Sequence, residues 1–143
     1  MGFSVSGSAA IVFVGLFLAF STAYTASANG FERVTDASTA VNEQSLERQN
    51  TALDITTATY DAGNETLTVE VVNEGTTTLA VNATDLLVDN TYRNDFTVRL
   101  VDDDDATGLW LPGERLHVEL SAPNQPTRVK VVSGPGVAAT EVL

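Results

Sequence analysis

The first charged side chain of this 143-residue chain is Glu32, and the uncharged segment before it contains a dense apolar core, AAIVFVGLFLAF. A helix from Ala9 to Ala28 would be roughly 30 Å long, which matches the hydrocarbon core of a bilayer. The large apolar side chains together favour insertion by roughly 4 kcal/mol, and no ionised group opposes them. The sequence therefore predicts a membrane anchor in residues 1–29, built on Ala9, Ile11, Val12, Phe13, Val14, Leu16, Phe17, Leu18 and Phe20.

A cleaved secretory signal peptide is the alternative for this segment, because Ala26-Ser27-Ala28 resembles the small-residue pattern that signal peptidases cut. The stretch before the apolar core, MGFSVSGS, has no Lys or Arg and so lacks the basic region that opens such signals. A prepilin-type leader would carry a basic residue before the Gly at the cut, whereas only Met1 precedes Gly2. We expect an uncleaved anchor with the N-terminus inside and the long domain translocated, and we keep cleavage after Ala28 as the alternative.

The charge balance of the chain restricts its partners. Nineteen Asp and Glu residues against seven Lys and Arg give a formal net charge of -12, which makes nucleic acid an unfavourable partner. Lys130 is the only lysine, and an acidic surface with so little lysine is typical of proteins from extremely halophilic archaea, where molar salt screens the repulsion. The chain has no cysteine, so neither disulfides nor thiolate metal sites are available.

Residues 30–50 are polar but keep apolar positions three to five residues apart, which predicts a helical stalk. Its apolar stripe is too thin to stabilise a helix alone, so the stalk either continues the membrane helix or pairs with another copy. A flexible linker rich in Ser, Thr, Asn and Gln is the alternative. The apolar positions are Phe31, Val34, Ala37, Val41 and Leu46.

The remaining segment, residues 51–143, shows the period-two pattern of β-strands. A first hairpin is predicted from Leu53 through the turn YDAGNE to Val71. Further strands are expected around 79–88, 96–100, 116–120, 129–131 and 137–143, with Phe96, Val98 and Leu100 alternating with polar positions. About seven strands with regular turn signals predict an extracytoplasmic domain, an antiparallel β-sandwich of the immunoglobulin-like type, so the fold class is mainly β behind one N-terminal helix.

Few side chains in this domain suggest chemistry. The run Asp102, Asp103, Asp104 and Asp105 is a weak Ca²⁺ candidate, because the EF-hand pattern fails where Ala106 and Thr107 replace an oxygen ligand and the required Gly. Trp110 is expected to anchor the core or a sheet corner. His117 has the opposite parity to its apolar neighbours, so it is expected to face solvent.

No catalytic machinery or cofactor site is predicted. The chain lacks a nucleophile elbow, a phosphate-binding Gly loop and any Cys, and it has a single His, so the common triads and His-rich metal sites cannot form. A carboxylate pair acting on a glycan is the one enzymatic arrangement left open. Asn64-Glu65-Thr66 and Asn82-Ala83-Thr84 match the N-glycosylation motif, so Asn64 and Asn82 are candidate modification sites in a translocated domain.

Several segments together resemble a known family. The anchor MGFSVSGSAAIVFVGLFLAF, the stalk GFERVTDA, the strand LTVEVVNEGTTTLAV and the turn LWLPGERLHV look like the FlaF family of archaellum accessory proteins from halophilic archaea. The resemblance implies a non-catalytic stator component anchored in the cytoplasmic membrane, with its β-sandwich beneath the surface layer. It further implies binding to surface-layer protein and to a FlaG-like partner, and a homodimer or hetero-oligomer.

Two other functions fit the same pattern. An archaellin or pilin-like filament subunit also has an apolar N-terminal helix followed by a β-domain, although such subunits normally have a processed leader. A secreted or anchored β-sandwich that binds ligands or cell-surface glycans is the second alternative. Both lack a catalytic requirement, so the absent motifs do not separate them from a stator.

Overall fold

The computed structural model describes residues 2–143, with side chains from Gly7 onward, so the expected intact N-terminus at Met1 lies outside the described residues. The chain divides into two compact units that meet in sequence between Glu43 and Gln44. One helix, α1 (Gly2–Gln49), supplies the described residues of the first unit and the first residues of the second. The single N-terminal helix and the antiparallel sheets that follow confirm the predicted fold class.

The apolar part of α1 has the properties of a membrane span. Its large apolar side chains are exposed throughout, with Phe13 and Phe17 at 75% and 67%, and α1 is long and apolar enough to cross a bilayer. The hydroxyl groups of Thr22 and Thr25 donate to helix carbonyl oxygens of Leu18, Ala19 and Ser21. Because these hydroxyls are satisfied within the helix, they oppose insertion less than free hydroxyls would.

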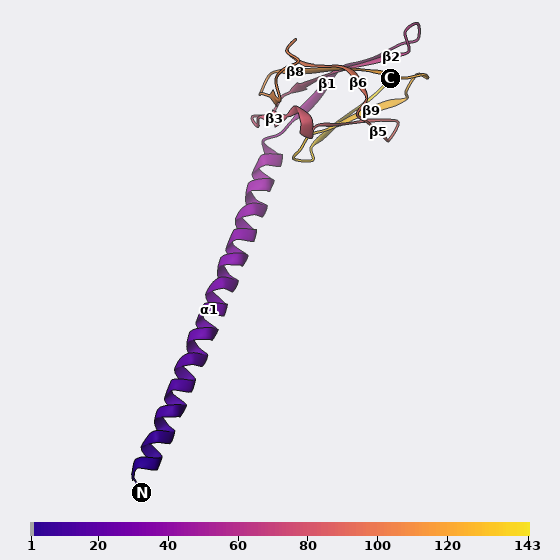
Figure 1. The fold of residues 1–143 in the computed structure, drawn as a ribbon. Coiled ribbons are helices and arrows are strands. Elements are labelled where there is room, and N and C mark those ends of the chain that lie inside the picture. The colour runs from indigo at the N-terminus through magenta and orange to yellow at the C-terminus, as the bar shows by residue number, and fades with distance from the viewer. Residues whose placement is uncertain (1) are drawn as a thin grey trace. The chain divides into compact units, whose positions relative to one another are not determined.

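The second unit contains two four-stranded antiparallel sheets (Figure 1). We call them sheet I, with strand order β1-β2-β8-β6, and sheet II, with order β10-β9-β4-β5. A two-stranded ribbon of β3 and β7 and a 3₁₀ turn, η1, complete the unit. The bounds are β1 (Leu53–Asp61), β2 (Thr66–Asn73), β3 (Leu79–Ala80), η1 (Val81–Ala83), β4 (Asp85–Val88), β5 (Thr91–Arg93), β6 (Phe96–Val101), β7 (Leu109–Trp110), β8 (Arg115–Ser121), β9 (Arg128–Val132) and β10 (Ala138–Val142).

The strand order is that of an immunoglobulin-like sandwich. In the spatial order given above, the strands of sheet I correspond to A, B, E and D of that fold, and those of sheet II correspond to G, F, C and C′. The inward side chains of both sheets form one apolar core, including Leu67, Leu120, Val129 and Trp110, each fully buried. The predicted immunoglobulin-like sandwich is therefore confirmed by its topology.

Both edge strands of sheet I contain a β-bulge, and each bulge changes which side chains face the core. In β6 the register shifts between Phe96 and Val98, so Val98 and Leu100 pair with Glu119 and His117. Val98 and Leu100 therefore lie on the outer face, and simple alternation from Phe96 is wrong beyond the bulge, because one extra residue reverses the parity of a strand.

The structure has ten strands between Leu53 and Val142, where about seven were expected. The segment expected as one run from Leu79 to Val88 is interrupted by η1, which turns the chain from the ribbon into sheet II. The short strand β5 follows Asp89 and Asn90, whose φ angles of 48° and 67° form a tight turn of the type that favours hairpins. Asp and Asn tolerate this left-handed backbone better than most residues, so the two-residue turn can join β4 to β5.

Candidate functional site

Residues at and just after the end of α1 are hydrogen bonded to loops of the sandwich, a contact that we call the junction. The carbonyl oxygen of Asn50 accepts from the backbone N–H groups of Thr76 and Thr77 at 2.8 and 3.2 Å. The Ala52 carbonyl oxygen accepts from Glu74 and Gly75 at 3.0 and 3.2 Å. Residues 50–52 are therefore fixed to the turn after β2 by their own backbone, without a flexible connection at this point.

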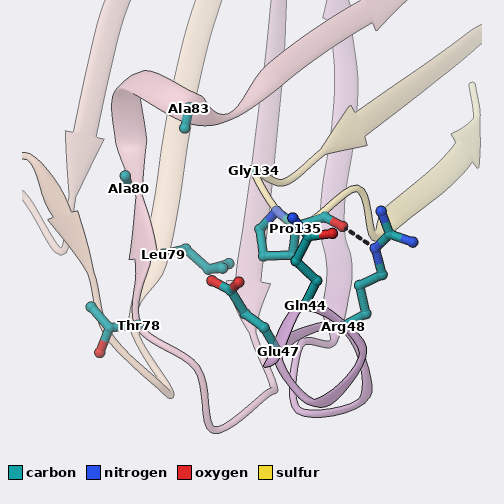
Figure 2. A pocket seen from close by; sticks show the side chains of 9 residues that line it. All are labelled: Gln44, Glu47, Arg48, Thr78, Leu79, Ala80, Ala83, Gly134 and Pro135. Atoms are coloured by element: carbon teal, nitrogen blue, oxygen red, sulfur yellow. Dashed lines mark hydrogen bonds between the residues drawn. The ribbon is translucent and has the colours of Figure 1, made fainter. Parts of the chain in front are cut away.

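Side chains of the last helical turns add to the junction. The Arg48 Nε donates to the Pro135 carbonyl oxygen at 2.9 Å, a contact that Figure 2 draws as a dashed line. The Thr51 hydroxyl donates to the Glu47 carbonyl oxygen at 2.7 Å, which satisfies one of the carbonyl groups left open at a helix C-terminus. A basic side chain in the last turn also suits the negative end of the helix dipole.

A surface pocket of about 360 Å³ lies beside these contacts. Its walls come from the end of α1, from β3 and η1, and from the loop between β9 and β10 (Figure 2). The lining residues are Gln44, Glu47, Arg48, Thr78, Leu79, Ala80, Ala83, Gly134 and Pro135. The charged side chains of this lining, Glu47 and Arg48, are both exposed to solvent.

Asn73 and Trp110 hold the turn after β2 against the β7–β8 connection. The fully buried Asn73 Nδ2 donates to the carbonyl oxygens of Thr77 and Trp110 at 2.8 and 3.2 Å. The indole N–H of Trp110 donates to the Glu114 carbonyl oxygen at 2.8 Å. Trp110 is thus the anchor in the core that its sequence predicted, whereas the hydrogen-bonding role of Asn73 was not anticipated.

The aspartate run is used to build a turn. Asp102 and Asp103 have φ angles of 45° and 71°, and Val101 and Asp104 exchange two backbone hydrogen bonds of 2.9 Å across them. The carboxylates of Asp102 and Asp104 accept from the backbone N–H groups of Arg115 and Ala106. Within residues 7–143, no group of three or more His, Asp or Glu side chains is placed to hold a metal ion.

The two candidate glycosylation residues are both exposed. Asn64 lies in the turn between β1 and β2, and its Nδ2 donates to the Asp61 carboxylate at 2.7 Å. Asn82 lies in η1, next to Ala83 of the pocket wall. The Thr hydroxyl of each motif is bonded to a nearby carbonyl oxygen: Thr66 to Asn64 and Thr84 to Ala80.

His117 lies on the outer face of sheet I between two carboxylates. Its ring nitrogens are 3.3 Å from Glu70 Oε1 and 3.3 Å from Glu119 Oε1. The Thr57 hydroxyl, followed by the His117 ring, lowers the pKa of Glu70. His117 is therefore on the outer face, as its parity predicted, but it is half-buried in a cross-strand cluster that only the register of β2 against β8 reveals.

Comparisons with known proteins found one family and several solved structures that are similar to this chain. A family model described as archaeal-type flagellin matches residues 2–142. The archaellum periplasmic stator protein FlaG from Sulfolobus acidocaldarius aligns with a TM-score of 0.45 at 17% identity, covering 65% of this chain and 99% of that chain. The stator complex of FlaF and FlaG from that organism gives a TM-score of 0.45 at 14% identity, covering 64% and 87%.

A comparison with curated proteins found no significant match. The assignment accordingly rests on the family model, which runs through the apolar helix and all strands of the sandwich. The chain belongs to the archaeal-type flagellin family.

Proposed function

We propose that this chain is a non-catalytic component of the archaellum, a stator that is anchored in the cytoplasmic membrane by α1 and holds surface-layer protein through its β-sandwich. The family supports a place in the archaellum, and the uncharged, exposed span of α1 supports a membrane anchor. The resemblance to the FlaF family supports the stator role and a FlaG-like partner.

The observation that carries this proposal is the junction between the end of α1 and the sandwich. A rotating filament needs a fixed element to react against, and such an element must transmit force between two attachment points. Backbone hydrogen bonds from Asn50 and Ala52 to residues 74–77 join the helix end to the sandwich without an intervening linker. A tether made of flexible Gly and Ser residues would extend under load before it transmitted force.

The proposed placement follows from the same features. The sandwich would lie outside the membrane, beneath the surface layer, with the N-terminus inside. Its acidic surface would tolerate molar salt, because screening removes most of the repulsion among a net charge of -12. Such a domain needs binding surfaces and no cleft for chemistry.

Deletion of the gene, followed by complementation, tests this function. We expect deleted cells to stop swimming and the intact chain to restore swimming, while surface-layer protein co-purifies with the chain from membranes at high salt. A junction variant with a Gly-Ser insertion between Gln49 and Asn50 should be expressed in membranes yet restore swimming poorly. Normal motility of deleted cells would contradict the proposal.

A filament subunit is the second candidate, favoured by the name of the family model. Subunits of this kind would be recovered in filaments sheared from cells, in amounts that match the filament mass. A stator would stay with the membrane after shearing. Quantifying the chain in both fractions by mass spectrometry separates the two functions.

A further inference from the structure

We propose that the outer face of sheet II binds the surface-layer protein. This face fits a partner surface that presents carboxylates around an apolar centre. This inference rests on the proposed function, because it names the face that the surface-layer partner would occupy. Figure 1 shows β5 and β9 of this sheet on the side of the sandwich opposite to β1, β6 and β8 of sheet I.

The strand register places a row of apolar and cationic side chains across this face. Leu87 of β4 is paired with Tyr92 of β5 on one side and with Lys130 of β9 on the other. Lys130 is in turn paired with Thr140 of β10. Tyr92 is 56% exposed, a large fraction for an aromatic side chain on a short edge strand. Its ring and the neighbouring Leu87 form the apolar centre of the face.

The cations of this face have no carboxylate partner within the part of the chain that the structure describes. The salt bridges there involve Arg93 and His117, so the Lys130 ammonium is unpaired. Arg128, two residues earlier on the same face, uses one guanidinium nitrogen to donate to the Asn90 side chain at 2.6 Å. On this face the register places Asp85 opposite Val132, and Asp89 accepts from the backbone of residues 127 and 128. Glu141 of β10 is paired with Val129, whose side chain is buried on the inner face.

The opposite face of the sandwich has a different character. On the outer face of sheet I, Glu70 and Glu119 flank His117, and Glu70 also accepts from the Thr57 hydroxyl. Glu70 and Glu119 therefore already have partners within the chain. In a protein with a net charge of -12, the only lysine therefore stands on a face where its charge is free for another molecule.

These features specify the chemistry of the partner. Burial of Tyr92 and Leu87 supplies affinity that salt does not screen, since the Debye length is only about 3 Å at 1 M ionic strength. Lys130 and Arg128 then require carboxylates in direct contact, because a cation left unpaired in an interface loses its hydration without compensation. A surface-layer protein with an acidic surface satisfies both requirements, and a basic or purely apolar partner does not.

The test uses the full-length chain in detergent micelles and surface-layer sheets isolated from the same cells, in molar KCl. The double variant Tyr92→Thr/Lys130→Gln removes the aromatic ring and one positive charge from sheet II. The control Arg115→Gln removes one positive charge from sheet I. Both changes are on exposed side chains, and equal thermal unfolding midpoints would show that each variant is folded.

We expect the double variant to bind the sheets at least about tenfold more weakly than the wild type, and the control to bind like the wild type. Equal binding by the wild type and the double variant would overturn the assignment of the face, while the stator function would stand. No binding by the wild type would overturn the stator function and this face together. A second copy as the true occupant would appear as loss of self-association in the double variant with unchanged binding to the sheets, which also overturns the proposal.

Discussion

Gly75 lies so close to Asn50 that a Cβ atom at position 75 would stand 2.5 Å from the Asn50 carbonyl oxygen. The same Cβ would be 2.7 Å from the Ala52 nitrogen and 2.9 Å from the Thr51 Cα, all of them backbone atoms. The chain segment after the helix and the turn after β2 are thus in contact main chain to main chain. This proximity is what allows the pairs of hydrogen bonds at Asn50 and Ala52.

Replacing Gly75 with Ala should therefore separate the helix end from the sandwich. We expect Gly75→Ala to lower the free energy of unfolding by about 2 kcal/mol, since backbone atoms must move to admit the methyl group. Thermal unfolding of the full chain in detergent measures the effect. The control Gly108→Ala adds a methyl group where nothing lies within 4 Å, so its midpoint should stay near that of the wild type. Equal midpoints for the two variants would contradict the close contact.

Asn73 offers a second test of the same region. In Asn73→Ala the carbonyl oxygens of Thr77 and Trp110 lose the side-chain donor, and the Gly75 N–H loses one of its two acceptors while keeping the Ala52 carbonyl oxygen. Leaving such groups unpaired in a buried site should cost about 2–3 kcal/mol. Denaturant titration of both Asn73→Ala and the exposed Asn124→Ala separates this cost from a general effect of losing an amide. A shared midpoint would mean that Asn73 is not structurally important.

The pair of Arg93 and Asp95 predicts part of the response to acid. Hydrogen bonding to Arg93 at 2.6 and 2.7 Å is the main reason that the pKa of Asp95 falls from 3.8 to about 2. Because the pKa is lower in the folded protein, this contribution is complete above about pH 4 and is lost as the pH falls toward 2. The wild type should therefore lose stability relative to Asp95→Asn between these two values.

The measurement for this pair is the difference between the two melting temperatures as a function of pH. Taking the difference removes the change in net charge that both proteins share on acidification. Since Asp95 is on the surface, we expect a small effect that shrinks in high salt. A difference that is constant from pH 7 to pH 2 would show that the pair does not exist in solution.

Strand parity explains how far the sequence predicts the sandwich. Leu67, Val69 and Val71 alternate without interruption, so β2 was predicted with its correct inward face. In β6 the position of the bulge after Phe96 is determined by the pairing with β8. No residue type near it signals the extra residue. The strands with a regular pattern were therefore predictable in detail, whereas the edge strands were predictable only in place.

The junction between the end of α1 and the sandwich shows a second limit of prediction from sequence. The apolar spacing of residues 30–50 allowed both a helix and a linker; in the structure α1 continues to Gln49, and its residues from Gln44 onward belong to the same compact unit as the sandwich. The contacts of Asn50 with residues 76 and 77 join positions far apart in sequence through backbone atoms. Side-chain patterns do not record such contacts, because they are made by backbone atoms.

Glycosylation at Asn64 and Asn82 stays a prediction that depends on translocation of the domain. We expect mass spectrometry of the chain from native membranes to find a glycan on at least one of them, because both are exposed on turns. Asn64→Gln and Asn82→Gln should each remove the corresponding mass, and Asn90→Gln, outside any such motif, should change nothing. An unmodified native chain would contradict this prediction.

The anchor can be tested by one charge in the middle of the apolar core. Arg at the centre of a span costs about 2.5–3.5 kcal/mol, which is close to the roughly 4 kcal/mol that favours insertion of this segment. Leu18→Arg should therefore shift the chain from the carbonate-resistant membrane fraction to the soluble fraction. Val41→Arg places the same charge on an equally exposed part of α1 outside the expected span, so that variant should stay in the membrane. A mature N-terminus at Asn29 in the wild type would contradict the anchor directly, because the apolar segment would then be a signal peptide removed after Ala28.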